Sequence, residues 1–140
     1  MAISKILNMK DCGGHFHGKH LKRALDYVMN PDKTQDGRLV GAINCQVDTA
    51  FEQMKETKRK FGKIDKRQGY HIILSFKENE VNPDTAFEIT QKFVQEYLGR
   101  SYEAVFVVHD NTAHVHSHIV FNSVSFVDGK KYRYEKGDWA

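Results

Sequence analysis

The sequence predicts an α+β fold: a central, mainly antiparallel β-sheet with helices packed on one face. Segments whose apolar residues recur every third or fourth position are mixed with segments whose apolar residues recur every second position. Two of the alternating segments are joined by a short polar turn, which favours antiparallel pairing. We expect residues 1–140 to form one domain, because 140 residues with 40% hydrophobic content suffice for a single core.

The first half of the chain contains two expected helices. The first ends before Pro31, and its apolar stripe is Leu21, Ala24, Leu25, Val28 and Met29. Asp48 is the expected cap of the second helix, which ends at Gly62. The inward residues of the second helix are Ala50, Phe51, Met54 and Phe61. Tyr27 lies roughly 130° from the centre of the first stripe, which predicts that its side chain leaves the core.

A third helix has the clearest boundaries. Asn82 is its expected N-cap, Pro83 occupies the first helical position, and Gly99 ends it. Its predicted apolar stripe is Ala86, Ile89, Phe93, Val94 and Tyr97. This helix should therefore pack along the sheet.

The expected strands follow from alternation and from turn residues. After a short apolar start at residues 3–7, strands are predicted at 38–44, 69–76, 104–109 and 115–122, with a further hairpin of 124–126 and 131–134. Asp128-Gly129 would turn that last hairpin. In segment 69–76, the residues at 70, 72, 74 and 76 share an apolar face, so His71 lies on the other face.

Composition and charge exclude several classes of protein. The 21 Lys and Arg residues exceed the 18 Asp and Glu residues by only three, but seven basic residues fall between Lys55 and Arg67. This run is either a phosphate-binding surface or an ordinary solvated helix face. Cys12 and Cys45 are too few for a disulfide scaffold. With no apolar run long enough to span a bilayer and no signal peptide, we expect a cytoplasmic chain that does not insert into a membrane.

Four of the eight histidines fall within the segment VVHDNTAHVHSHIVFN, which spans residues 107–122. In a strand, His114, His116 and His118 share one face. If residues 110–113 form the turn, His109 lies opposite His114 and diagonal to His116. The opposite face of the hairpin is apolar, with Phe106, Val108, Val115, Ile119 and Phe121.

This histidine face predicts a divalent metal site. From spacing alone, His116 should bind together with either His114 or His118, since His-x-His on a strand is a common chelate. Three imidazoles leave coordination positions open for water or a phosphate oxygen, as in catalytic sites. The ligands do not fix the metal, because imidazoles favour transition metals over Mg²⁺ by affinity.

Two motifs together resemble the relaxases of plasmid and integrative-element mobilisation, of MobP type, within the HUH endonuclease superfamily. One is the histidine segment just described, and the other is GKHLKRALDYVMNPDKT at residues 18–34. The resemblance implies an HUH or RRM-like sandwich fold and a DNA-nicking activity at an origin of transfer. It implies Tyr27 as the nucleophile, giving a 5′-phosphotyrosine and a free 3′-hydroxyl, with His109, His116 and His118 holding Mg²⁺ or Mn²⁺.

The resemblance also ranks residues around the site. His114 lies outside the ligand trio and is expected to support the site or contact DNA, while His71 resembles a supporting histidine on a neighbouring strand. Further candidates for such contacts are His20, Arg23, Lys33, Arg67, Lys131 and Arg133. One departure is that Asn111 stands where an acid two residues after His109 is expected, which leaves the orienting partner of His109 open.

The implied partners are single-stranded origin-of-transfer DNA, with accessory relaxosome proteins and a coupling protein reached through regions outside this chain. The resemblance further implies a bacterial cytoplasmic protein that is transferred with the DNA. The sequence ends at Ala140 without a clear stop signal, which is compatible with an N-terminal part of a longer protein.

Two alternative functions stay open at this stage. A non-catalytic module that binds single-stranded nucleic acid would carry the histidines on its surface without using them. A small metal-dependent hydrolase would attack with a metal-bound water, and Tyr27 would then be structural. The string HVHSH resembles the ligand run of metallo-β-lactamases but lacks their aspartate.

Overall fold

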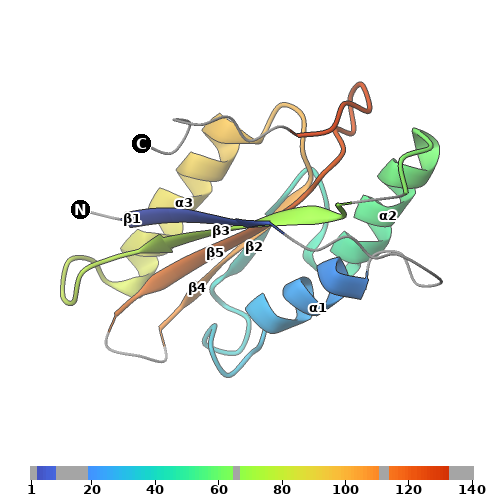
Figure 1. Cartoon of the computed structure of the whole chain (residues 1–140). Coiled ribbons are helices and arrows are strands. Elements are labelled where there is room, and N and C mark those ends of the chain that lie inside the picture. Colours follow the sequence, from blue (N-terminus) through green and yellow to red (C-terminus); the bar gives the residue numbers. More distant parts are fainter. Residues whose placement is uncertain (1–2, 9–18, 65–66, 111–113, 133–140) are drawn as a thin grey trace.

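A computed structural model describes residues 3–8 by their backbone and residues 19–64, 67–110 and 114–132 in full. The elements in chain order are β1 (Ile3–Asn8), α1 (Lys19–Val28), β2 (Val40–Ile43), a 3₁₀ turn η1 (Val47–Thr49), α2 (Ala50–Lys60), β3 (Gly69–Ser75), α3 (Pro83–Tyr97), β4 (Ala104–His109) and β5 (His116–Asn122). The strands form one sheet in the order β1-β3-β5-β4-β2, and every neighbouring pair is antiparallel (Figure 1). The predicted α+β class with an antiparallel sheet is confirmed.

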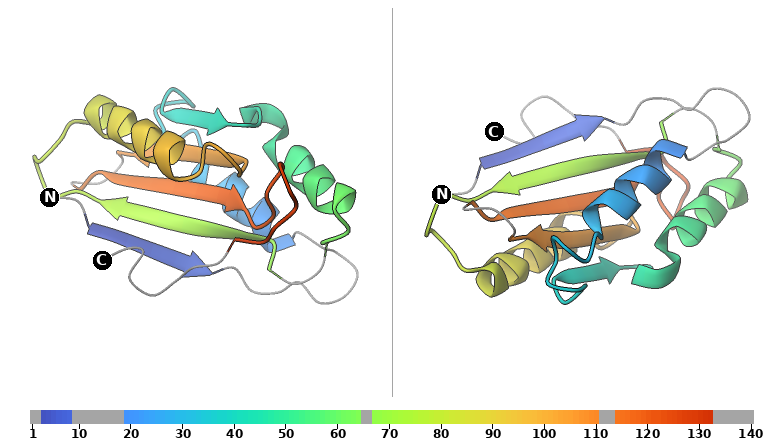
Figure 2. Two further views of the ribbon diagram at one scale, coloured as in Figure 1. Left: turned by 90° about the horizontal axis from the view of Figure 1, so that it is seen from above. Right: turned by 90° about the horizontal axis from the view of Figure 1, so that it is seen from below.

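The helices, however, cover both faces of the sheet and not one (Figure 2). α3 lies on one face, whereas α1 and α2 lie on the other. The cause is β4, whose six residues are all buried, so the strand presents apolar side chains in both directions. On the second face the buried stripe of α1 packs with Val105, Val107 and Val120. The expected histidine face is therefore also a packing face.

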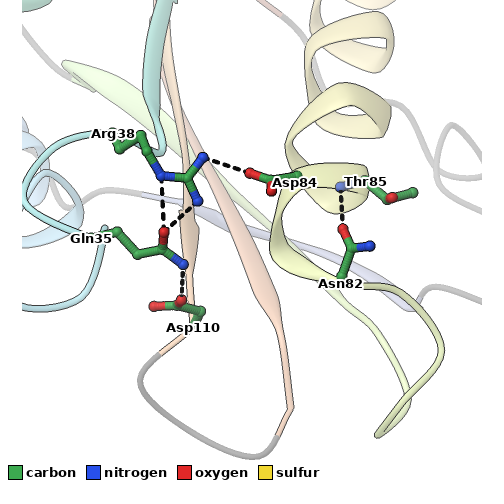
Figure 3. A network of polar contacts seen from close by, with 6 residues as sticks. All are labelled: Gln35, Arg38, Asn82, Asp84, Thr85 and Asp110. Carbon is green, nitrogen blue, oxygen red and sulfur yellow. Dashed lines mark hydrogen bonds and ion pairs between the residues drawn. The ribbon is translucent and has the colours of Figure 1, made fainter.

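The face covered by α3 matches the alternation of the sequence. Tyr70, Ile72, Leu74 and Phe76 lie in the same core cluster as the apolar residues of β4 and β5. The Asn82 side chain accepts a hydrogen bond from the Thr85 amide at 2.8 Å, as predicted for the N-cap (Figure 3).

The predicted stripe of α3 is partly wrong. Ile89 and Tyr97 are 40% and 38% exposed, and the helix buries Thr90 together with the predicted Ala86 and Val94. The Thr90 hydroxyl donates to the Ala86 carbonyl at 2.7 Å and lies 2.6 Å from the Ser117 hydroxyl of β5. Two hydroxyls that satisfy each other can be buried where the sequence pattern favours only apolar residues.

Other element boundaries also differ from expectation. β2 is shorter than the predicted 38–44, and at its end Asn44 has a left-handed backbone conformation that cannot extend a strand. Asp48 lies within η1, and the N-cap of α2 is Thr49. Residues 133 and 134 of the predicted last hairpin lie outside the described residues, and in its described part Val124 and Lys131 form an antiparallel bridge between the two predicted strands. Among the described residues, no helix is long and apolar enough to cross a membrane.

One lysine of the basic run lies on the buried side of α2. Lys58 is 2% exposed, and burial lowers its pKa to about 7, although the nearby charge of Glu103 opposes this shift. Glu103 is itself buried, and burial raises the pKa of its carboxyl. Asn122 connects this cluster to the helix by donating to the Met54 carbonyl and to the Glu103 carboxyl, both at 3.0 Å. For Lys58, the interpretation as a solvated helix face is wrong.

We predict that Lys58→Met stabilises the protein at neutral and lower pH. The pKa of Lys58 is about 7 in the folded chain and 10.5 in its unperturbed state, so between these values the unfolded chain binds more protons. The free energy of unfolding therefore rises from pH 7 to pH 10, and the full cost is present below pH 7. Replacing a buried charge by an apolar side chain commonly gains about 1–4 kcal/mol.

Urea denaturation at pH 6 and pH 10 measures this effect. The variant should be more stable than the wild type at pH 6, and the difference should shrink at pH 10. Lys60→Met, on the exposed side of the same helix, is the control and should change stability little at either pH. A Lys58→Met protein less stable than the wild type at pH 6 would contradict the assignment.

Candidate metal centre and nucleophile

The β4–β5 hairpin sets the positions of three histidines. His109 is the direct cross-strand partner of His116, and His118 is the partner of Val107, so the three side chains share one face. The predicted register, with His109 opposite His114, is wrong because β5 begins at His116 and the connection is longer than four residues. His114 precedes the strand and is exposed.

A fourth histidine joins this face from β3. His71 is paired with Val120, two pairs along from His118, and the two imidazoles meet across the strands. The distance from His71 Nε2 to His118 Nδ1 is 2.7 Å, which is a hydrogen bond, and the ring centroids are 5.0 Å apart. The expectation that His71 lies on the face opposite the apolar residues of its strand agrees with this placement.

His109 lies between the sheet and α1. Its ring is 5% exposed, its centroid is 4.2 Å from that of His118, and its Nε2 is 2.8 Å from the carbonyl oxygen of Val28. Since a carbonyl can only accept, His109 Nε2–H donates to it. The last residue of α1 thus orients the ring, and this backbone partner could not be identified from side-chain types.

The electrostatics of the cluster keep its rings neutral. Burial, together with the smaller effect of neighbouring histidines, lowers the pKa of His118 to about 3 and that of His71 to about 4. Burial also lowers the pKa of His109, while the Val28 carbonyl opposes the shift. Neutral imidazoles keep one lone pair each, and this is the form that binds metal ions.

Tyr27 lies directly beside this cluster. Its neighbours Leu21, Leu25 and Val28 are buried, whereas Tyr27 is 51% exposed, as its position off the stripe predicts. The Tyr27 ring makes edge-to-face contacts with His109 and His118, with centroids 5.9 Å and 6.3 Å apart. Its phenol is therefore accessible to solvent and adjacent to the imidazoles at the same time.

Lys33 lies over the other surface of Tyr27. Its Nζ is 4.1 Å from the centroid of the Tyr27 ring, within the range of a cation–π contact. The Lys33 carbonyl accepts a hydrogen bond from the Asp110 amide at 3.2 Å, which joins the loop after α1 to the residue after His109. A positive charge is thus held next to both the phenol and the histidines.

Polar side chains extend this connection to α3 (Figure 3). Gln35 donates to the Asp110 carboxylate and accepts from Arg38, and the Arg38 guanidinium contacts Asp84 at 2.6 Å. Asp110 is therefore engaged by Gln35, and the orienting partner of His109 is the Val28 carbonyl instead. Gln35, Arg38 and Asp84 could not be identified from the sequence, because Arg38 and Asp84 are 46 residues apart, on a loop and a helix, and no sequence pattern links them.

The remaining candidates lie elsewhere or outside the described residues. His20 is half-buried and Arg23 exposed on α1, and within the described residues neither has a hydrogen bond or ring contact with the histidines. Arg67 stacks at 5.6 Å on Tyr70, near the start of β3, and Lys131 lies close enough to Lys58 to lower its pKa. Arg133 lies outside the described residues.

The histidines of this face are of a residue type that binds divalent ions. Within the described residues, no three His, Cys, Asp or Glu side chains stand in metal-binding geometry. His109 and His118 each have one ring nitrogen in a hydrogen bond to the protein, which leaves the other nitrogen of each ring for a ligand. Neutral nitrogen donors of this kind fit a transition-metal ion better than Mg²⁺.

The sequence is similar to known relaxases over most of its length. Residues 27–140 match the family described as "Relaxase: MobA/VirD2-like, nuclease domain". The chain is 34% identical over 118 residues, 84% of its length, to one "Protein rlx" of Staphylococcus aureus, and 33% identical over 136 residues to another. It is 30% identical to the group II intron-interrupted relaxase LtrB of Lactococcus lactis subsp. cremoris over 86% of its length.

These relatives are considerably longer. The aligned part covers 34% and 38% of the two Staphylococcus proteins and 25% of LtrB, so the chain spans between a quarter and two fifths of their lengths. The family match includes the histidine hairpin and begins at Tyr27. The chain belongs to the MobA/VirD2-like family of relaxase nuclease domains.

Proposed function

We propose that this chain nicks one DNA strand at an origin of transfer and remains covalently attached to the 5′ end through Tyr27. The membership in a relaxase nuclease family supports the reaction class. The observation that carries the assignment is the position of Tyr27, a half-exposed phenol in edge contact with His109 and His118. A tyrosine that served only to fill the core would be buried with the stripe of α1.

In the proposed step, the Tyr27 Oη attacks the scissile phosphorus in line with the bond to the 3′ oxygen. A phosphorus–Oη bond forms and the phosphorus–O3′ bond breaks, and the proton lost by the phenol is balanced by the proton gained at the 3′-hydroxyl. The number of phosphoester bonds is unchanged. The free 3′-hydroxyl of a second strand end can therefore reverse the step, which gives strand transfer rather than hydrolysis.

His109, His116 and His118 are the residues that would hold a divalent cation, with Mg²⁺ or Mn²⁺ expected in use. When bound, such an ion supplies charge stabilisation at the non-bridging oxygens of the phosphate. The His109 and His118 imidazoles are neutral before the ion arrives, because burial lowers the pKa of both. They therefore need lose no proton to bind it.

Lys33 is the proposed phosphate contact next to the nucleophile. It is half-buried, and its Nζ lies on the Tyr27 ring, where a bound strand would bring a backbone phosphate. His114, exposed at the end of the connection that leads into β5, is a further candidate for contact with single-stranded DNA. Accessory relaxosome proteins and a coupling protein would bind regions of a longer protein, which would act in the bacterial cytoplasm and be transferred with the DNA.

Tyr27→Phe tests the nucleophile. Incubation of the wild type with end-labelled single-stranded origin DNA and Mn²⁺ should give a covalent protein–DNA adduct on a denaturing gel. The variant keeps the ring and its contacts with the histidines but has no attacking oxygen. We expect the adduct to fall by more than about 1000-fold while DNA binding is kept.

The same gel distinguishes the alternative functions. Tyr97→Phe, another exposed tyrosine, is the control and should form adduct at the wild-type level. Strand cleavage without any adduct would indicate a hydrolase that uses metal-bound water. Binding of DNA without cleavage under all metal conditions would indicate a non-catalytic binding module.

His116→Ala tests the metal site. Loss of one of three imidazole ligands should weaken Mn²⁺ binding by about 100-fold or more and abolish nicking, with single-stranded DNA binding largely kept. Calorimetric titration with Mn²⁺ and the nicking assay measure the two effects independently. His20→Ala, on α1 and without a contact to the cluster among the described residues, is the control. Nicking at a normal rate in His116→Ala would show that the ligand assignment is wrong.

Lys33→Gln tests the phosphate contact. Each lost phosphate contact reduces the slope of log affinity against log salt by about 1. The variant should therefore bind single-stranded DNA more weakly than the wild type and show a shallower slope. Fluorescence anisotropy with single-stranded DNA at several salt concentrations gives this slope. Lys60→Gln removes the same charge from the far helix α2 and should leave the slope unchanged. Equal slopes for Lys33→Gln and the wild type would exclude the contact.

A further inference from the structure

We infer that the side-chain amide of Gln35 fixes the position of Lys33 over the ring of Tyr27, which makes Gln35 a positioning residue for the candidate site. The amide is itself held between Arg38 and Asp110. The inference rests on the proposed function, because it takes Tyr27 as the nucleophile and Lys33 as the phosphate contact. It adds the groups that hold this positive charge in place.

The loop between α1 and β2 is attached to Asp110 at two points. The Asp110 backbone N–H donates to the Lys33 carbonyl at 3.2 Å, and the Gln35 side chain donates to the Asp110 carboxylate. Between these two points Thr34 is fully buried, and its hydroxyl donates to a backbone carbonyl of the same loop at 3.0 Å. The backbone of Lys33 is therefore held at its own carbonyl and at the residues that follow it. Its Nζ lies 4.1 Å from the centroid of the Tyr27 ring.

The two partners of Gln35 require an amide between them. The guanidinium of Arg38 can only donate hydrogen bonds, and the carboxylate of Asp110 can only accept them. Gln35 Oε1 accepts from Arg38 Nε at 2.9 Å and also from Nη2, while Gln35 Nε2 donates to Asp110 (Figure 3). An amide offers an acceptor and a donor at once, whereas a carboxylate in its place would lack the donor. The orientation of the Gln35 amide is thus set by both partners.

Arg38 connects this bridge to the helix on the opposite face of the sheet. Its Nη1 lies 2.6 Å from the carboxylate of Asp84, in the first turn of α3, whereas Tyr27 belongs to α1 on the other face (Figure 2). The two side chains of this ion pair are 53% and 68% exposed, so the pair contributes little to stability. What it does is restrict the directions in which the guanidinium can face Gln35. The loop beside the phenol is therefore oriented partly by α3.

The backbone of the turn is consistent with a functional constraint. Gln35, Asp36 and Gly37 have φ angles of 53°, 57° and 87°, so two residues that are not glycine adopt the left-handed region in succession. Such residues are uncommon, and they keep this conformation where the surrounding contacts hold it, often at functional sites. The Asp36 backbone N–H donates to the Pro31 carbonyl at 2.9 Å, which closes the turn within the loop. The Gln35 side chain then fastens the turn to other elements.

Nuclear magnetic resonance of the full chain, without metal or DNA, tests the position of Lys33. Because Nζ lies over the Tyr27 ring, the adjacent ε protons of Lys33 should be shifted upfield by the ring current. Tyr27→Leu removes the ring and gives the unshifted position. We expect Gln35→Ala to move the Lys33 resonance to this unshifted position. An unshifted resonance in the wild type, or a fully shifted one in Gln35→Ala, would overturn the inference.

Asp36→Gly is the matched control for Gln35→Ala. Position 36 lies in the same turn, its φ of 57° suits glycine, and its side chain takes no part in the bridge. The Lys33 resonance should therefore keep its upfield position in this variant. A resonance lost equally in both variants would show that the turn as a whole, and not the Gln35 amide, positions Lys33.

A reciprocal exchange separates the bridge from a general effect on the loop. Gln35→Glu keeps the acceptor for Arg38 but places a second carboxylate against Asp110, so the upfield shift of Lys33 should be lost. Adding Asp110→Asn returns a donor, and the bridge forms with its direction reversed. We expect the shift to be largely restored in the double variant. A double variant that behaves like Gln35→Glu alone would contradict the bridge.

The rate of adduct formation connects the bridge to the reaction. With single-stranded origin DNA and Mn²⁺, Gln35→Ala should form the covalent adduct about 10–100-fold more slowly in a single turnover, because the charge beside the phenol is misplaced. Asp36→Gly should react at the wild-type rate. Normal adduct formation in Gln35→Ala, despite a lost upfield shift, would overturn the positioning role. If the wild type forms no adduct, the proposed function is wrong, and the resonance of Lys33 still decides whether Gln35 holds it.

Discussion

The packing of α1 against the histidine face of the sheet is the constraint on which the candidate site depends. Leu21, Leu25 and Val28 lie in one buried cluster with valines of β4 and β5. This packing brings the end of the helix over His109, where the Val28 carbonyl receives its hydrogen bond. Without the helix, the histidines would lie on an open sheet, and water would compete for every ring nitrogen.

The same packing explains how one residue of the helix can be reactive while its neighbours are structural. Tyr27 precedes the buried Val28 and lies at the rim, so its ring touches the imidazoles while about half of the side chain stays exposed. Burial lowers the pKa values of His71 and His118 well below neutrality, so these two rings add no charge of their own. Lys33 supplies the positive charge beside the phenol. This charge would attract a polyanionic strand toward the phenol.

The sequence predicted what depends on periodicity and on turn chemistry. The alternation in residues 104–122 separates an apolar face from a histidine face, and the capping residues of α3 follow directly from Asn82-Pro83. It could not predict that β4 is buried on both sides, because a continuous apolar run does not say what covers each face. The partner of His109 was also hidden, since it is a backbone carbonyl 81 residues away and every residue type offers one.

Lys58 shows why a charge pattern is a weak guide to position. Its sequence neighbours are exposed cations of a helix face, but Lys58 faces inward near Glu103, at the opposite end of β4 from His109. The histidine face is thus polar at both ends and apolar between them. At the end of the face near Glu103, the Asn122 side chain donates a hydrogen bond to the Met54 carbonyl of α2. The Met54 side chain packs in the same cluster as Leu21 and Leu25 of α1. Asn122 therefore contributes to the position of α2, and through α2 to the position of α1, which carries Tyr27. The buried Lys58 beside it, in contrast, costs stability.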